Sequence, residues 1–116
     1  MAIRTAGVGH VHLLVDDVER AVAFYRDVFG AEEELRVGEQ LVFMRLGGDE
    51  IVGLDGRPEE ENAPAHFGLD LAEGEDLDAA LAEVESAGGA VVERGEHAEG
   101  LHYAYVADPD GNVIEL

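Results

Sequence analysis

The chain has 116 residues, with 27 acidic and 7 basic side chains and a formal net charge of −20, and its length predicts one domain or two small halves sharing a core. All seven basic residues are scattered arginines, so we expect no basic surface for nucleic acid or for an anionic membrane. Cysteine is absent, which excludes disulfides, and no apolar run approaches the ~20 residues of a membrane span, so we expect a cytoplasmic protein.

The first half of the chain predicts a strand, a helix and three further strands. Residues 8–15 alternate between apolar and polar positions, as a half-buried strand does. Asp16 and Asp17 then offer a helix N-cap, and apolar residues recur at helical spacing until Gly30. Three short strands follow, over residues 32–37, 40–46 and 50–54.

The same order of elements repeats in the second half. Its predicted strands span residues 66–71, 90–94, 101–106 and 112–116, and its helix runs from the Asp76 cap to Gly88-Gly89. We therefore expect a first module over residues 1–55, an exposed linker over 56–65 and a second module over 66–116. The predicted fold class is α+β: two βαβββ modules form a cup-shaped curved sheet, with the helices on the outside.

Strand alternation selects the side chains that enter this cup. If the apolar partners of each strand pack under the helices, His10, His12, His66 and Glu115 face the open side. Imidazole nitrogens and a carboxylate oxygen suit a divalent metal, so His10, His66 and Glu115 are the candidate ligands. The alternative for each residue is an ordinary hydrogen-bonded or surface role.

Three segments closely resemble the vicinal oxygen chelate superfamily: GHVHLLVDDVERAVAFYRDVFGAE, HFGLDL and YAYVADPDGNVIEL. This superfamily includes glyoxalases, bleomycin-resistance proteins, fosfomycin-resistance enzymes and extradiol dioxygenases. The resemblance implies paired βαβββ modules with a cup-shaped site, usually in a homodimer. It also implies that His10, His66 and Glu115 take the places of the superfamily's metal ligands.

The chain departs from particular branches of this superfamily. Glyoxalases carry a second glutamate ligand where this sequence has Gly53 or a neighbour of it, and the fosfomycin branch uses lysine, which is absent here. Extradiol dioxygenases usually have four modules and an additional catalytic histidine. What remains is a His-His-Glu set that resembles the iron or manganese sites of the dioxygenases and the fosfomycin thiol transferases.

Further residues are candidates for substrate contact or proton transfer. In the triad-bearing relatives a tyrosine at the spacing of Tyr105 contacts the substrate, although Tyr105 could equally pack between strands. His12 is interpreted either as an acid-base or second-sphere residue or as part of the cavity wall. His97 is expected in an exposed loop, where it could also sit on a lid over the cup.

Two functions remain open. The first is a metal-dependent glyoxalase-like or dioxygenase-like enzyme, in which Fe, Mn, Zn or Ni chelates and activates a small oxygen-bearing substrate. In a homodimer, His10 of one chain could join His66 and Glu115 of the other. The alternative is a metal-free, bleomycin-resistance-like protein that binds a small molecule, for which the negative charge would suit a cationic drug. The acidic, lysine-free composition is typical of a halophile or of a GC-rich genome.

Overall fold

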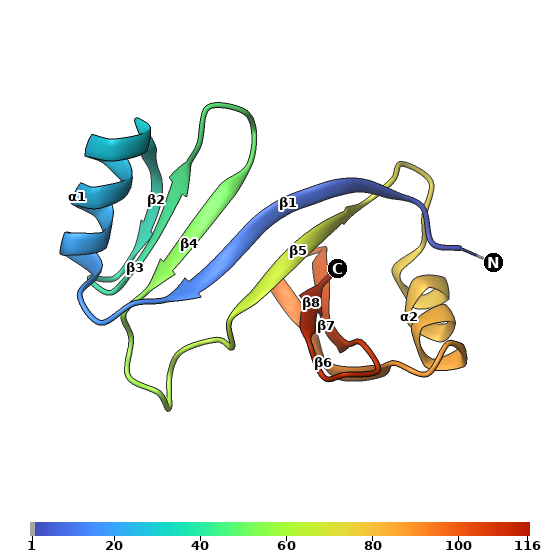
Figure 1. Ribbon diagram of the computed structural model, residues 1–116. Helices are drawn as coiled ribbons and strands as arrows, with labels where there is room; N and C mark the ends of the chain where they lie inside the picture. Colours follow the sequence, from blue (N-terminus) through green and yellow to red (C-terminus); the bar gives the residue numbers. More distant parts are fainter. Residues whose placement is uncertain (1) are drawn as a thin grey trace. The chain divides into compact units, whose positions relative to one another are not determined.

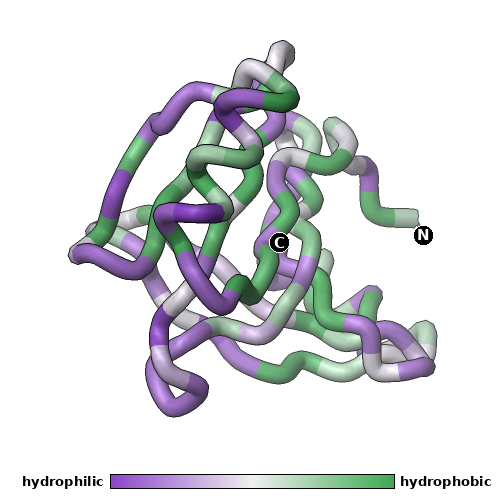
Figure 2. Tube along the Cα trace, turned by 60° about the vertical axis from the view of Figure 1, so that its left-hand side comes forward, coloured by the Kyte–Doolittle hydropathy of each residue, from purple (hydrophilic) through white to green (hydrophobic). Residues whose placement is uncertain are grey.

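The computed structural model describes residues 2–116 of the chain, and these form eight strands and two helices. They group into two compact units: one is Gly9–Ala65, and the other joins His66–Leu116 with the segment up to Val8. Hydrophilic residues are spread along the whole trace rather than gathered in one segment (Figure 2). Neither of the helices in the described part of the chain has the length and apolar character needed to cross a membrane.

The first unit is a four-stranded sheet with one helix. In spatial order its strands are β2 (Glu32–Val37), β3 (Leu41–Arg45), β4 (Ile51–Asp55) and the part of β1 (Thr5–Leu14) from Gly9 onward. Strands β1 and β4 are parallel, and the other neighbours are antiparallel. Helix α1 (Val18–Phe29) follows β1 and lies on one face of this sheet (Figure 1).

The second unit repeats this topology. Its strand order is β6 (Ala90–Ala98), β7 (Leu101–Ala107), β8 (Val113–Glu115) and β5 (His66–Leu71), and β5 is parallel to β8. Helix α2 (Leu77–Ser86) follows β5 and packs on one face of β6 and β7 (Figure 1). The predicted α+β class with two βαβββ modules is therefore confirmed. The predicted cup and the module boundaries at 55 and 66 stay predictions.

Local hydrogen bonds explain where the helices begin and end. The carboxylate of Asp17 accepts from the backbone N–H of Arg20 at 3.0 Å, and Asp76 caps α2 through the N–H of Ala79 in the same way. Helix α1 ends at Gly30, whose φ of 71° is the left-handed conformation that glycine adopts without strain. Both predicted caps are thus present.

Each helix packs against the apolar side chains of its own sheet. The core of the first unit consists of Val18, Val22, Ala31, Val42, Met44, Val52 and Leu54. In the second unit Leu81 of α2 packs with Ala104 and Val106 of β7, and with the half-buried Ile114 and Leu116. Because side chains alternate along a strand, this packing turns the neighbouring Tyr103, Tyr105 and Glu115 to the face that α2 does not cover.

Candidate metal centre

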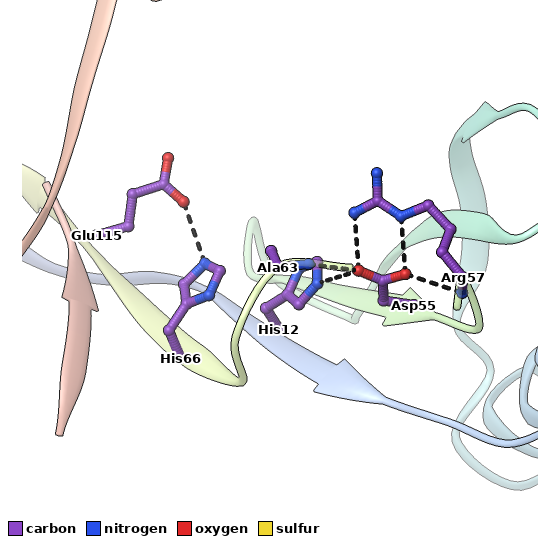
Figure 3. A network of polar contacts seen from close by, with 6 residues as sticks. All are labelled: His12, Asp55, Arg57, Ala63, His66 and Glu115. Atoms are coloured by element: carbon purple, nitrogen blue, oxygen red, sulfur yellow. Dashed lines mark hydrogen bonds and ion pairs between the residues drawn. The ribbon is translucent and has the colours of Figure 1, made fainter. Parts of the chain in front are cut away.

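His66 and Glu115 form a pair within the second unit. They belong to the parallel strands β5 and β8, whose register places Glu115 beside Gly68, two residues after His66. His66 Nε2 and Glu115 Oε1 lie 3.1 Å apart, and the carboxylate accepts the hydrogen bond (Figure 3). The two side chains are only 1% and 12% exposed. A histidine and a carboxylate therefore face one another, with little of either side chain exposed to solvent.

The spacing of these two atoms fits ligands of one metal ion. Ligand atoms that each lie about 2.1 Å from an ion, at an angle of about 90° to 109°, are about 3.0 to 3.4 Å apart. The 3.1 Å between His66 Nε2 and Glu115 Oε1 falls in this range. A nitrogen and a carboxylate oxygen are also the donors that Mn, Fe, Zn and Ni accept. The pair thus fits two ligands of a divalent metal.

Tyr105 lies beside this pair. It is paired in register with Glu115 across β7 and β8, and it is 9% exposed. Its ring contacts the His66 ring edge to face, with the ring centres 4.9 Å apart. Tyr103 lies two residues before Tyr105 on the same face of β7, and the centres of the two rings are 5.4 Å apart. The predicted site residues His66, Glu115 and Tyr105 are therefore brought together.

The same face of the second unit holds His97, which we expected in an exposed loop. The predicted loop was wrong, because β6 continues to Ala98 instead of ending near residue 94, but the side chain is exposed as expected, at 50%. His97 Nε2 lies 2.7 Å from Glu115 Oε2, and its ring stacks on Tyr103 at 4.1 Å. Gly95 pairs with Tyr103, and side chains two residues apart on a strand point to the same face. This alternation could have indicated from the sequence that His97 lies on the face of Tyr103.

The other two predicted histidines, His10 and His12, lie in the first unit. His10 is half-buried on β1 and is paired in register with Ile51 of β4. His12, two residues later, is buried and pairs in register with Gly53. The role of His10 as a third ligand beside His66 and Glu115 stays a prediction.

His12 belongs to a buried polar network that the sequence did not reveal. Its Nε2 lies 2.8 Å from Oδ2 of Asp55, whose side chain is 0% exposed. The same carboxylate accepts from the guanidinium of Arg57 at 2.8 and 2.9 Å, and from the backbone N–H groups of Arg57 and Ala63 (Figure 3). These bonds tie the predicted exposed linker to the end of β4.

The network determines the charge of Asp55. Burial by itself raises the pKa of this carboxyl group. The hydrogen bonds from Arg57, His12 and the backbone N–H of Ala63 outweigh burial and hold the pKa of Asp55 well below its ordinary value. Asp55 is therefore a permanent anion at neutral pH, and its oxygens are already occupied by donors.

The resemblance implies a second glutamate ligand where this chain has Gly53 or a neighbour of it. A Cβ atom on Gly53 would lie 3.0 Å from His12 Nδ1 and 3.1 Å from Phe43 Cε1. These distances are shorter than ordinary van der Waals contacts, so the side chains of His12 and Phe43 occupy the room that a larger residue would need. A glutamate at residue 53 would therefore require His12 and Phe43 to move.

Comparison with known proteins identifies relatives. Residues 7–116 match the family described as the Glyoxalase/Bleomycin resistance protein/Dioxygenase superfamily. The metallothiol transferase FosB of Shouchella clausii (strain KSM-K16) is 29% identical over 118 residues, which cover 95% of this chain and 78% of that protein.

Solved structures share the fold at lower identity. An extradiol ring-cleaving dioxygenase from B. fuscum matches 98% of this chain with a TM-score of 0.77 and 22% identity, and the match covers 32% of that chain. The Mn(II)-bound glyoxalase from Novosphingobium aromaticivorans matches 96% with a TM-score of 0.76 and 21% identity, covering 37% of that chain. This chain thus spans about a third of each of these two structures. Because the family model matches residues 7–116, nearly the whole chain, the chain belongs to the Glyoxalase/Bleomycin resistance protein/Dioxygenase superfamily.

Proposed function

We propose that this chain is a metal-dependent enzyme in which His10, His66 and Glu115 hold a divalent ion and a small oxygen-bearing substrate binds beside them. The observation that carries the proposal is the buried His66–Glu115 pair, with ligand atoms 3.1 Å apart. The names of two relatives support it, because one is a metallothiol transferase and the other is a Mn(II)-bound glyoxalase. We place Mn first among the candidate ions Fe, Mn, Zn and Ni.

The chain's own residues have distinct proposed roles in this site. When bound, the ion would supply Lewis-acid chemistry to oxygen atoms of the substrate. Tyr105 contacts and orients the substrate, since its ring is held against His66 and lies on the same strand face as Glu115. His12 is the proposed proton donor or acceptor for the substrate, and its hydrogen bond to Asp55 fixes the orientation of its ring. The rings of Tyr103 and Tyr105 border the substrate.

The first test is metal binding by protein purified without a histidine tag. We expect the parent chain to retain a stoichiometric metal, measured by elemental analysis, and to bind Mn(II) in a calorimetric titration. His66→Ala should weaken Mn(II) binding at least about 100-fold, because it removes a direct ligand rather than a residue that orients one. His102→Ala is the matched control, because His102 is exposed on β7 and its ion-pair partner is Glu96.

A parent chain that binds none of the four ions would contradict the proposal. That outcome would favour the second candidate, a metal-free protein that binds a flat cationic molecule. The specific observation in favour of this candidate is the row of four rings formed by His66, Tyr105, Tyr103 and His97 beside a carboxylate. The faces of the two tyrosine rings attract cations, and the Glu115 carboxylate adds a negative charge beside them.

The source of His10 can be tested separately by mixing two inactive variants. If two copies of the chain share each site, His10→Ala and Glu115→Gln chains should complement one another in a mixed dimer. One site would then combine His10 of one copy with Glu115 of the other, and Mn(II) binding would return on mixing. If each chain supplies all of its own ligands, no mixture of the two variants should bind Mn(II). Size-exclusion chromatography with light scattering establishes whether a dimer forms at all.

A further inference from the structure

The two oxygens of the Glu115 carboxylate have different partners. Oε1 faces His66, the proposed ligand, at 3.1 Å. Oε2 accepts a hydrogen bond from His97 on β6 at 2.7 Å, the shorter of the two contacts. The carboxylate is therefore held from both sides, and one oxygen is left pointing toward the proposed metal site.

The hairpin of β6 and β7 fixes the position of His97. Its ring lies nearly parallel to that of Tyr103, with an angle of 12° between them and 4.1 Å between ring centres. Tyr103 in turn lies over Gly95, where a Cβ atom would approach the tyrosine ring to 2.8–2.9 Å. The absence of a side chain at residue 95 thus leaves room for the ring that supports His97.

A carboxylate that binds a metal through one oxygen is commonly oriented by a donor on its other oxygen, and loss of that donor weakens binding about 10- to 100-fold. We propose that His97 is such a positioning residue: its imidazole N–H holds Glu115 with Oε1 directed at the ion. This inference rests on the proposed function, because it assigns a role toward the same site. His97 itself is half-exposed and is not one of the proposed ligands.

Two substitutions separate the hydrogen bond from the ring contact. His97→Phe keeps an aromatic ring to stack on Tyr103 but removes the donor, whereas His97→Gln keeps an N–H donor of similar reach. We expect His97→Phe to weaken Mn(II) binding about 10- to 100-fold and His97→Gln to stay within about threefold of the parent. His102→Phe, on the opposite face of the same hairpin, should leave Mn(II) binding unchanged.

Mn(II) affinity is measured by the electron paramagnetic resonance signal of the free ion, and urea unfolding of the metal-free variants is measured in parallel. Equal Mn(II) affinity of the parent and His97→Phe would overturn the inference while leaving the proposed function intact. A loss as complete as that of Glu115→Gln would also overturn it, because His97 would then be a ligand. A parent chain that binds no metal would overturn both.

Discussion

The two units each contain a histidine paired with a carboxylate, and the two pairs are built alike. His12 and Asp55 join β1 to β4, and His66 and Glu115 join β5 to β8. In both cases the strands are parallel, and the carboxylate pairs in register with the residue two places after the histidine. Equivalent backbone geometry therefore produces both pairs.

The pairs differ in what else reaches the carboxylate. Asp55 accepts hydrogen bonds from a guanidinium, two backbone N–H groups and an imidazole, and its side chain is 0% exposed. Glu115 accepts hydrogen bonds from the imidazoles of His66 and His97. Backbone and guanidinium donors keep their protons at every physiological pH, whereas an imidazole can give up its proton to become a metal ligand. The fixed donors around Asp55 therefore make it a structural carboxylate, whereas Glu115, which faces two imidazoles, is the carboxylate proposed to bind a metal.

The largest predicted effect is that Asp55→Asn and Glu115→Gln change different properties: the first lowers stability and the second abolishes metal binding. Asp55→Asn should lower the free energy of unfolding by about 3 kcal/mol, because it leaves buried donors without their anion. Glu115→Gln should cost less than about 1 kcal/mol in metal-free protein, since the hydrogen bonds from His66 and His97 that it weakens come from imidazoles, and His97 is half-exposed to solvent. Glu115→Gln should abolish Mn(II) binding, whereas the Asp55→Asn protein that remains folded should bind Mn(II) nearly as the parent does. Urea unfolding and calorimetric titration measure the two properties.

The contribution of Asp55 to the free energy of unfolding should decrease at acid pH. Its pKa is lower in the folded chain than in the unfolded chain, where an aspartate titrates near about 3.9. Its stabilising effect is therefore fully present above about pH 4 and is lost as the pH falls through the folded pKa. The difference in unfolding free energy between the parent and Asp55→Asn should narrow only in acid.

If Asp55→Asn and Glu115→Gln destabilise the chain equally, or both abolish Mn(II) binding, the distinction between the two pairs is wrong.

The placement of His66 and Glu115 could be predicted from the sequence, because strand alternation determines the face to which each side chain points. Ile114 and Leu116 pack under α2, and this fixes the side to which Glu115 points. His66 and Tyr105 follow from the same parity, and the resemblance to the superfamily selects them from other polar strand residues. The paired βαβββ modules were predictable for similar reasons, since each element has a clear apolar period and a cap or turn at its ends.

The first pair was not predicted, because the predicted strand ended at residue 54 and no motif of the superfamily pointed to Asp55. In the structure β4 extends to Asp55, and the alignment of β1 with β4 brings this carboxylate to His12. Arg57 looked like part of an exposed linker, although an arginine two residues after an aspartate at a strand end was a weak signal. His97 was missed because the glycines at 95 and 100 suggested a loop, whereas Gly95 stands in a strand beneath the Tyr103 ring.

The smallest predicted effect tests how tightly the first pair is packed. Gly53→Ala adds a Cβ that would lie 3.0 Å from His12 Nδ1, so it should push the imidazole away from Asp55 and cost about 1 to 2 kcal/mol. Gly47→Ala is the control, because a Cβ there meets nothing within 4 Å. If the cost arises through the His12–Asp55 bond, Gly53→Ala should be less harmful in an Asp55→Asn background, where that bond is already impaired. Additive costs in this double-mutant cycle, measured by urea unfolding, would place the strain on Phe43 instead.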